Sequence, residues 1–151
     1  MKTDIKNLEH SIRQRLLDIS KKRRIDYQFC LTHYCLERFL YRLSHSIHTD
    51  KFILKGALLL MAWTDERFRP TRDLDLLGYG NATPDNLNLV ITDTCRTEVE
   101  PDGLVFDTDA ITIEEIRESL DYDGYRVKTR AYLGNVRIPI QIDVAFGDVI
   151  L

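Results

Sequence analysis

The chain has 151 residues, of which 44% are hydrophobic and 30% are charged, and its formal net charge at pH 7 is −3. This length and composition suit a single domain that is large enough to bury a core. The acidic balance argues against broad, nonspecific nucleic-acid binding, which normally requires a basic domain.

Neither membrane insertion nor export is predicted. No apolar run is long enough to span a membrane, and the start, MKTDIKNLEH, carries charges where a signal peptide needs an apolar stretch. The cysteines Cys30, Cys35 and Cys95 lack the paired spacing of a metal site, which favours buried, reduced thiols. His45 and His48 are expected to be surface residues rather than metal ligands. We expect a cytoplasmic protein.

Two helices are predicted at the start of the chain. Apolar residues recur at helical spacing over residues 5–19, so the first helix runs to about Ser20. Residues 27–46 form the second, longer helix. The basic run at 21–24 closes the first helix, where it complements the helix dipole, and is either a solvated cap or an RNA contact.

A strand, a turn and a short helix are predicted next. The apolar run 52–54 is too short for a helix, and a second apolar run, 58–63, follows Lys55, Gly56 and Ala57. Glycine at such a turn lets the backbone approach a ligand, and the free N–H groups that begin the helix attract an anion. The turn is therefore either plain punctuation or a phosphate-binding site.

An Asp-x-Asp pair follows in a predicted strand. Because side chains alternate along a strand, Asp73 and Asp75 project to one face while Leu74 and Leu76 enter the core. Two neighbouring carboxylates either face open water at an edge strand, shift a pKa, or bind a hard cation such as Mg²⁺.

The middle of the chain predicts one more helix and a strand. Thr83 is a suitable N-cap and Pro84 suits the first helical position, so this helix runs from there to Cys95. A strand is expected near Leu104, whereas 107–118 fits either a strand or a helix.

Two alternating segments predict a hairpin. Residues 125–133 and 136–146 alternate between apolar and polar positions, and Gly134 and Asn135 join them as a two-residue turn. Asp143 falls on the polar face of the second strand. If this hairpin flanks the strand of the Asp-x-Asp pair, three carboxylates converge on two metal ions, an arrangement suited to in-line phosphoryl displacement.

The first hairpin strand also carries a basic strip. Arg126, Lys128 and Arg130 lie on its polar face. An RNA substrate could use this strip together with the basic run at 21–24.

Six segments in a fixed order resemble a known family. They are ERFLYRLS (37–44), FILKGALLL (52–60), RPTRDLDLLG (69–78), DGL (102–104), YDGYRV (122–127) and IQIDVAFGD (140–148). They span nearly the whole chain, and RPTRDLDLLG is the most specific. The set resembles the AbiEii/AbiGii nucleotidyltransferase-like toxins of bacterial toxin–antitoxin and phage-defence systems, within the DNA polymerase β-like nucleotidyltransferase superfamily.

The resemblance implies the fold, the activity and the partners. It implies an α/β fold with a nucleotidyltransferase-type mixed β-sheet flanked by helices and preceded by two N-terminal helices. Residues 1–151 would form a single domain, with a helical N-terminal part at 1–50 and a nucleotide-site core at 51–151. The implied activity transfers a nucleotide from an NTP to an acceptor and releases pyrophosphate. Relatives characterised as toxins modify tRNA, so a tRNA acceptor and a cognate antitoxin protein are expected, with no membrane partner.

The resemblance also assigns roles to residues. Asp73 and Asp75 match the metal-binding pair, and Asp143 matches the third carboxylate, which helps to activate the attacking hydroxyl. All three are implied to be catalytic and to hold Mg²⁺, as a two-metal site. Gly56 and Ala57 match the step that receives the triphosphate.

Three basic residues and one substitution bear on nucleotide binding. Ala57 stands where the superfamily has serine, which leaves only backbone donors for the phosphate. Lys55, Arg69 and Arg72 are either nucleotide-binding charges or salt-bridge partners of nearby acids.

The ending departs from the family pattern. Relatives usually continue into a mostly helical C-terminal region with further functional residues, and this chain stops at Leu151. Two other functions therefore stay open: a catalytically silent, truncated fragment that acts by protein binding, and a small-molecule nucleotidyltransferase.

Overall fold

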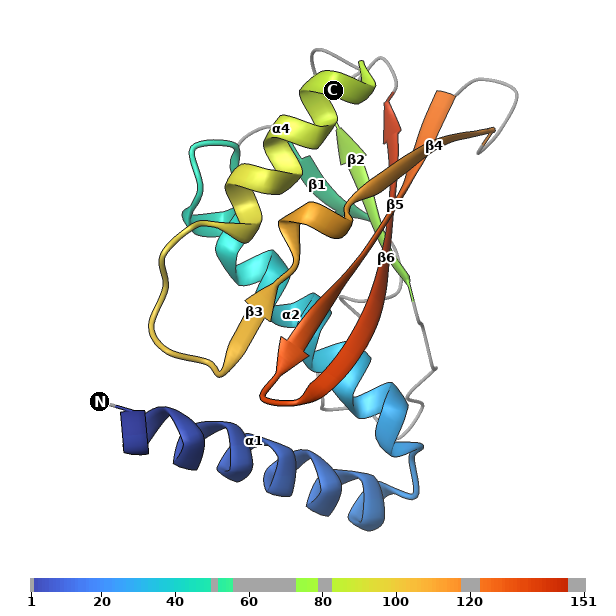
Figure 1. Ribbon diagram of the computed structural model, residues 1–151. Coiled ribbons are helices and arrows are strands. Elements are labelled where there is room, and N and C mark those ends of the chain that lie inside the picture. The colour runs from blue at the N-terminus through green and yellow to red at the C-terminus, as the bar shows by residue number, and fades with distance from the viewer. Residues whose placement is uncertain (1, 50–51, 56–72, 79–82, 118–122, 147–151) are drawn as a thin grey trace.

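The computed structural model describes residues 2–49, 52–55, 73–78, 83–117 and 123–146 (Figure 1). In this part of the chain the elements are, in order, α1 (Lys2–Arg23), α2 (Tyr27–His45), β1 (Phe52–Lys55), β2 (Asp73–Gly78), α4 (Pro84–Cys95), β3 (Leu104–Phe106), the 3-10 helix η2 (Thr108–Ala110), β4 (Thr112–Arg117), β5 (Asp123–Leu133) and β6 (Val136–Phe146).

The described strands form one six-stranded mixed sheet. Its order is β1-β2-β6-β5-β3, and β4 also pairs with β5. Among the described strands, only β2 and β6 run parallel, since the other neighbouring pairs are antiparallel. The predicted α/β class, with two N-terminal helices and a mixed sheet, is confirmed. The predicted hairpin does flank the strand of the Asp-x-Asp pair, because β6 lies directly beside β2.

The hairpin of β5 and β6 has the predicted turn. Leu133 pairs with Val136, so Gly134 and Asn135 are the two loop residues. Gly134 has a φ of 60°, and Asn135 is not among the described residues with a positive φ. This pattern fits a type II′ turn, which requires a positive φ only at its first central residue and so favours glycine there.

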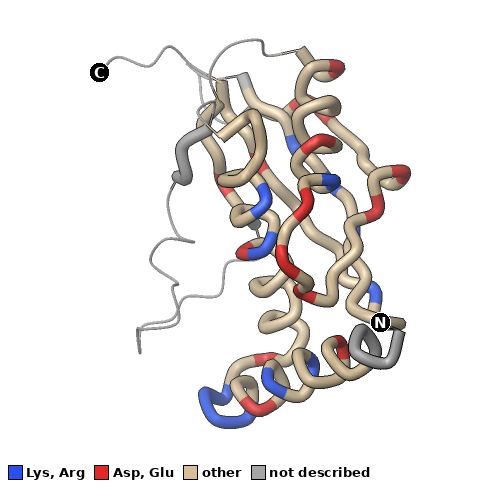
Figure 2. Tube along the Cα trace, turned by 90° about the vertical axis from the view of Figure 1, so that its left-hand side faces the viewer, with Lys and Arg blue, Asp and Glu red and all other residues tan. Residues whose placement is uncertain are grey.

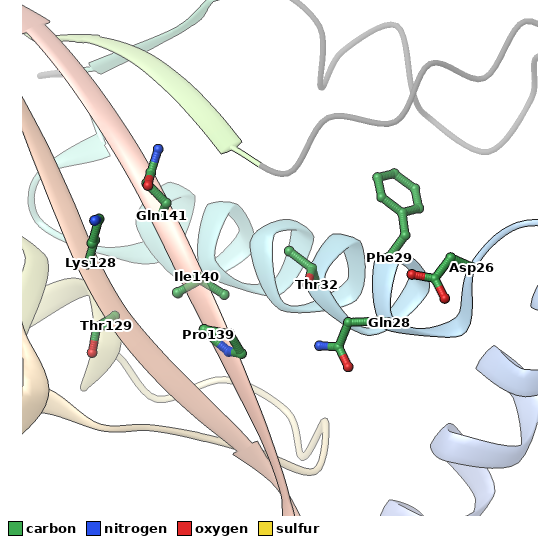
Figure 3. Close-up of a pocket in the computed structure, with 9 residues that line it drawn as sticks. All are labelled: Asp26, Gln28, Phe29, Thr32, Lys128, Thr129, Pro139, Ile140 and Gln141. Atoms are coloured by element: carbon green, nitrogen blue, oxygen red, sulfur yellow. The ribbon is translucent and has the colours of Figure 1, made fainter.

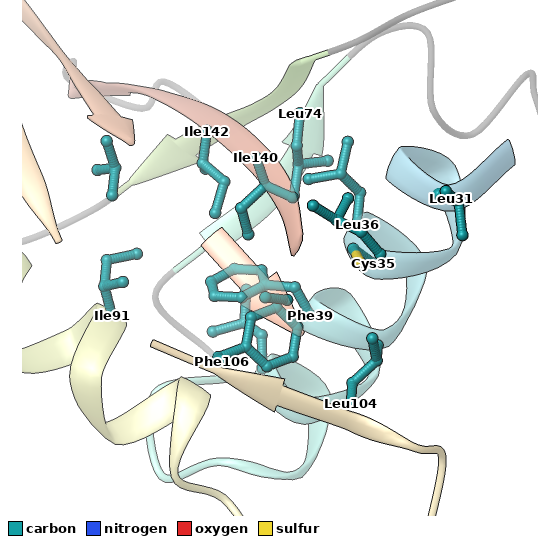
Figure 4. Packing of buried hydrophobic residues seen from close by; sticks show 14 of the residues in the cluster. Leu31, Cys35, Leu36, Phe39, Leu74, Ile91, Leu104, Phe106, Ile140 and Ile142 are labelled. Atoms are coloured by element: carbon teal, nitrogen blue, oxygen red, sulfur yellow. The ribbon is translucent and has the colours of Figure 1, made fainter. Parts of the chain in front are cut away.

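The core lies between the sheet and two helices. In Figure 1, α2 and α4 cover one face of the sheet. Figure 4 shows the buried apolar cluster between them, to which both helices and the strands contribute. Each fully buried Leu or Ile side chain contributes about 1.5–3 kcal/mol of stability. The labelled members are Leu31, Cys35, Leu36, Phe39, Leu74, Ile91, Leu104, Phe106, Ile140 and Ile142.

The helix α1 lies at one end of the molecule (Figure 1). Its Ile12 and Leu16 side chains are buried and belong to the same core cluster. The basic run 21–24, the last residues of α1 and the start of the turn to α2, is exposed and forms a continuous blue stretch in Figure 2. The helix thus runs three residues beyond the predicted end near Ser20, because the basic residues continue its last turn.

A buried ion pair joins α2 to the start of β3. Arg42 Nη1 and Nη2 donate to the two carboxylate oxygens of Asp102 at 2.6 and 3.0 Å. Arg38 Nε donates to the same carboxylate at 2.8 Å, and the backbone N–H of Leu104 donates to it at 3.1 Å. The carboxylate is therefore satisfied by one backbone and two side-chain donors, as a buried charge requires.

The surroundings of this pair fix its protonation. Burial raises the pKa of Asp102, but the hydrogen bonds from Arg42 and Arg38 outweigh burial and hold the pKa below its usual value. Burial, with the nearby Asp102 charge, raises the pKa of Tyr34 to about 12. The Tyr34 hydroxyl is thus protonated at neutral pH and donates to the Asp102 carbonyl at 2.8 Å.

Several local predictions are confirmed. The helix α4 begins as expected: the Thr83 side chain accepts from the Asn86 N–H, and Pro84 is the first helical residue. The second helix matches the predicted 27–46 to within one residue. Residues 107–118, left open between strand and helix, contain the short helix η2 followed by the strand β4.

Of the predictions about the burial of cysteines and histidines, one is wrong. Cys30 and Cys35 are buried, Cys95 is half-buried, and all three are free thiols. Burial raises the pKa of Cys35 and Cys95 to about 12, so both are neutral at pH 7. The prediction that His48 is a surface residue is wrong: it is buried, and its Nε2 lies 2.9 Å from an Asp93 carboxylate oxygen on α4. This contact closes the gap between the end of α2 and α4.

Candidate active site

Two predicted catalytic acids occupy opposite positions on adjacent strands. Asp75 on β2 pairs in parallel register with Asp143 on β6. Leu74 and Leu76 on β2 are buried in the core, as predicted, so Asp75 belongs to the opposite face. Neighbouring strands lie about 4.8 Å apart, which brings the backbones of the two acids equally close. The strand pairing thus places two carboxylate-bearing residues side by side.

Charged residues continue from this pair across five of the six described strands. Lys55 on β1 is the register partner of Asp75, and Arg126 on β5 is the register partner of Asp143. Glu114 on β4 is in turn the partner of Arg126. One row of the sheet therefore carries, in order, Lys55, Asp75, Asp143, Arg126 and Glu114. We call these five residues the charged row.

The centre of the charged row contains a bidentate ion pair. Arg126 Nε donates to Asp143 Oδ1 at 3.0 Å, and Arg126 Nη2 donates to Asp143 Oδ2 at 3.1 Å. The Asp143 side chain is only 9% exposed, whereas that of Arg126 is 35% exposed. Both oxygens of the third predicted catalytic acid thus accept from one guanidinium, a geometry that is strong and directional.

The neighbouring row holds the remaining acid of the Asp-x-Asp pair. Asp73, at the start of β2, pairs through its backbone with Gln141 on β6, and Gln141 pairs with Lys128 on β5. Asp73 and Asp75 are two residues apart on one strand and so share a face of the sheet. For Asp73 the structure describes the backbone only.

A groove begins next to these rows (Figure 3). It has a volume of about 380 Å³ and runs between the start of α2 and the strands β5 and β6. Lys128 and Gln141, from the row of Asp73, form part of its wall. The full lining is Asp26, Gln28, Phe29, Thr32, Lys128, Thr129, Pro139, Ile140 and Gln141.

The groove continues into a more basic section. An adjoining cavity of about 560 Å³ shares Gln28, Lys128 and Pro139 with it and adds Arg130 and Arg137. Arg130 is engaged with Asp107 at 3.0 Å, and Lys128 lies 3.8 Å from Glu114. The basic strip predicted on the first hairpin strand is therefore present, but two of its three members, Arg126 and Arg130, are bound to aspartates.

The donors on this face suit a hard cation. Carboxylate oxygens are the ligands that Mg²⁺ prefers, and Asp75 and Asp143 bring two carboxylates to neighbouring positions. Among the described residues no group of three or more acidic, histidine or cysteine side chains could hold a metal, and the Asp73 side chain is not part of that set. The residues present fit a magnesium site, and two of its acids, Asp75 and Asp143, have described side chains.

Of the predicted nucleotide-binding residues, the structure describes only Lys55. Lys55 ends β1 beside Asp75, so the chain leaves β1 next to the acids. Gly56, Ala57, Arg69 and Arg72 lie outside the described residues, as does the predicted short helix at 58–63. Their nucleotide-binding roles stay predictions.

Sequence reasoning missed that Arg126 holds Asp143. The signal was present in the predicted hairpin, because counting back equally from Gly134 and Asn135 along both strands brings Arg126 opposite Asp143. The alternation along that strand instead suggests a basic strip for RNA that includes Arg126.

Comparisons with known proteins bear on this site. Residues 38–151 match the family model described as "Nucleotidyl transferase AbiEii toxin, Type IV TA system". No curated protein matches the chain at a significant level. No described helix is long and apolar enough to cross a membrane.

Two solved structures from Helicobacter pylori match most of this chain. One is JHP933, with 15% sequence identity and a TM-score of 0.48, where the match covers 83% of this chain and 47% of that one. The other is described as a candidate nucleotidyltransferase, with 12% identity, a TM-score of 0.46 and coverages of 80% and 46%. The chain thus spans about half the length of each.

Proposed function

Because this chain belongs to the AbiEii nucleotidyl transferase toxin family of type IV toxin–antitoxin systems, we propose that it carries the nucleotide-transferring site of such a toxin. It takes a nucleotide from an NTP, passes it to a tRNA acceptor and releases pyrophosphate. It acts in the cytoplasm, as part of phage defence, and a cognate antitoxin protein restrains it.

The observation that carries this proposal is the register of Asp75 with Asp143 on parallel strands. Two carboxylates at such close range repel each other unless a cation lies near them. Arg126 offsets part of this repulsion, and a second acid beside that ion pair is more than a structural role requires. Such an arrangement is typical of a site built to hold a metal ion and phosphates.

Asp73, Asp75 and Asp143 would hold Mg²⁺ in a two-metal site. When bound, Mg²⁺ neutralises charge on the triphosphate and lowers the pKa of a coordinated hydroxyl. The three acids orient the reacting groups from one face of the sheet. Asp143, which is more buried than Asp75, favours loss of the proton from the acceptor hydroxyl.

The triphosphate is seated by the segment that follows β1. Gly56 and Ala57 offer backbone N–H groups, and Lys55, Arg69 and Arg72 supply positive charge. The position of Lys55 beside Asp75 supports this assignment, because a chain leaving β1 there starts next to the acids. The acceptor oxygen bonds to the α-phosphorus as the bond to pyrophosphate breaks.

The acceptor enters along the basic section of the groove. Lys128 and Arg137 line it with exposed side chains, and Lys128 reaches the row that contains Asp73. Basic side chains along a groove attract the phosphates of RNA. With an overall charge of −3, the chain would bind RNA locally rather than over its whole surface.

Calorimetric titration of each of the four NTPs, with and without Mg²⁺, tests the proposal. The chain is compared with Asp73→Asn/Asp75→Asn, and with Asp85→Asn/Asp109→Asn as a control of equal charge change at exposed sites. Mg²⁺-dependent binding that is lost only in the first variant is the expected result. The variant should stay folded, because removing a repelling pair does not destabilise a fold.

Absence of binding at millimolar NTP would overturn the proposal and favour a silent fragment that acts by protein binding. NTP binding followed by transfer to a small molecule instead of tRNA would favour the small-molecule nucleotidyltransferase. Screening tRNA and small acceptors with labelled NTP separates these two enzymes.

A further inference from the structure

The guanidinium of Arg126 lies where a catalytic divalent cation would compete with it. It donates to both oxygens of Asp143 at 3.0 and 3.1 Å, and Asp143 is the register partner of Asp75. A positive side chain of the protein itself, Arg126, therefore contacts one member of the acid pair. A structural ion pair needs no second acid beside it, so this arrangement calls for a separate explanation.

The positive charge of Arg126 disfavours the binding of a divalent cation at Asp143, and a bound cation would disfavour Arg126 there. Two like charges several ångströms apart repel by some kcal/mol at the effective dielectric of a protein surface, and the repulsion doubles when one ion is divalent. The Asp143 carboxylate is only 9% exposed, so solvent screens this contact weakly. A metal ion that binds Asp143 must either tolerate the guanidinium or displace it.

We propose that Arg126 is a resident counter-cation for the catalytic acids, which weakens binding of the metal alone and moves to the triphosphate when the nucleotide arrives. This proposal rests on the nucleotidyltransferase function proposed above. Arg126 is a positioning residue in the resting protein and a nucleotide-binding residue in the loaded one.

The position of Arg126 allows this exchange. Its side chain is 35% exposed. Because the next residue on β5, Val127, is buried in the core, Arg126 belongs to the opposite face of the sheet. A triphosphate offers several oxygens to a planar guanidinium, which matches phosphate as well as carboxylate in a two-point contact. The guanidinium therefore exchanges one bidentate anion for another and does not pass into water alone.

This exchange makes metal and nucleotide binding cooperative. The nucleotide draws Arg126 from Asp143 and so raises metal affinity, and by linkage the metal raises nucleotide affinity to the same degree. The acids consequently stay paired with Arg126 until both components are present. A lone divalent ion in the cell does not trap the site in an unproductive, metal-filled form.

The test measures Mn²⁺ binding to the intact chain by calorimetry, with and without a non-hydrolysable NTP analogue. The variants are Arg126→Gln, which removes the charge, and Arg126→Lys, which keeps the charge but removes the fork. Arg130→Gln is the matched control, because Arg130 lies on the same strand, is 39% exposed and is paired with an aspartate, Asp107, away from the acids.

The proposal expects Arg126→Gln to bind Mn²⁺ alone about tenfold more tightly than the unmodified chain, with the enhancement by the NTP analogue largely lost. Arg126→Lys should lie between the two, and Arg130→Gln should match the unmodified chain in both measurements. Circular dichroism checks that every variant is folded. If Arg126→Gln does not fold, the intermediate affinity of Arg126→Lys carries the test.

Other outcomes overturn the proposal in distinguishable ways. If folded Arg126→Gln binds Mn²⁺ equally or more weakly, or keeps the full enhancement by the analogue, Arg126 is not a counter-cation that the metal displaces. If Asp75→Asn/Asp143→Asn binds Mn²⁺ as well as the unmodified chain does, the acids are not the metal site, and the proposed function fails with the inference.

Discussion

Two bidentate arginine–aspartate pairs in the described part of the molecule have different surroundings. Arg42 and Asp102 join α2 to β3 in the core, where their side chains are 6% and 7% exposed. Arg126 and Asp143 face each other across the hairpin on the sheet's polar face. Both pairs use two parallel hydrogen bonds. They differ in how completely each aspartate is satisfied and in which charges stand nearby.

That difference supports the proposed contrast between a structural pair and a functional one. Asp102 also accepts from Arg38 and from the Leu104 N–H, so it has donors beyond its main partner. Asp143 has a second acid, Asp75, as its neighbour on β2. An ion pair alone therefore says little about role, whereas an ion pair beside a further like charge indicates a site in which charges are exchanged.

Breaking the buried pair should have the largest effect. Replacing Arg42 with Gln leaves the Asp102 charge buried without its main partner, and the free energy of unfolding should fall by about 3–5 kcal/mol. Urea titration followed by circular dichroism measures this. A loss of under about 1 kcal/mol would mean that Arg38 alone satisfies Asp102, and the contrast between the two pairs would then disappear.

The same pair should govern stability in acid. Folding lowers the pKa of Asp102 below its ordinary value of 3.8, so its contribution is present in full above pH 4 and is lost as the pH falls through the folded pKa. The stability difference between the unmodified chain and Asp102→Asn should therefore be constant near neutral pH and shrink in more acidic solution. A difference that stays the same down to the acid transition would contradict this assignment.

Breaking the pair at the acids should cost less stability. Arg126→Gln removes a partner that is 35% exposed, so solvent screens the change and a loss of about 1–2 kcal/mol is expected. Mg²⁺ should restore part of this loss in Arg126→Gln but have little effect on Arg42→Gln. Equal responses to Mg²⁺ in thermal melts would remove the distinction between a functional and a structural pair.

The smallest effect on stability is expected for an exposed contact on the same face of the sheet. Lys128 lies 3.8 Å from Glu114, with side chains 55% and 59% exposed. Lys128→Gln should change the free energy of unfolding by less than about 0.5 kcal/mol, because exposed ion pairs contribute little. A larger change in urea titration would show that solvent screens this face less than its exposure implies, and the estimate for Arg126 would have to rise.

Local patterns in the sequence were enough to predict most elements. The alternation along β5 and β6 predicted both strands, their turn and the polar face of Asp143, because a hairpin is specified by neighbouring residues. The cap residues Thr83 and Pro84 located the start of α4 for the same reason. The strand β4 stayed ambiguous, since its sequence, TIEEIR, has too few apolar residues to separate a strand from a helix.

Contacts between distant residues could not be predicted in the same way. Nothing near Arg42 points to Asp102, and nothing near His48 points to Asp93, because both pairs arise from the packing of separate elements. The parallel pairing of β2 with β6 joins strands from distant parts of the chain, so no local pattern predicts it. The contact of Arg126 with Asp143 is an intermediate case. It could be predicted from the hairpin, but only by pairing the two strands residue by residue from the turn.

The central place of β6 in the sheet also sets when the site can exist during protein synthesis. β6 is inserted between β2 and β5, although it is made after both of them. At about 5–20 residues per second, a ribosome therefore carries for several seconds a nascent chain that has Asp75 but not yet Asp143. Asp75 and Asp143 can therefore come together only after translation has passed β6, the last of the described strands.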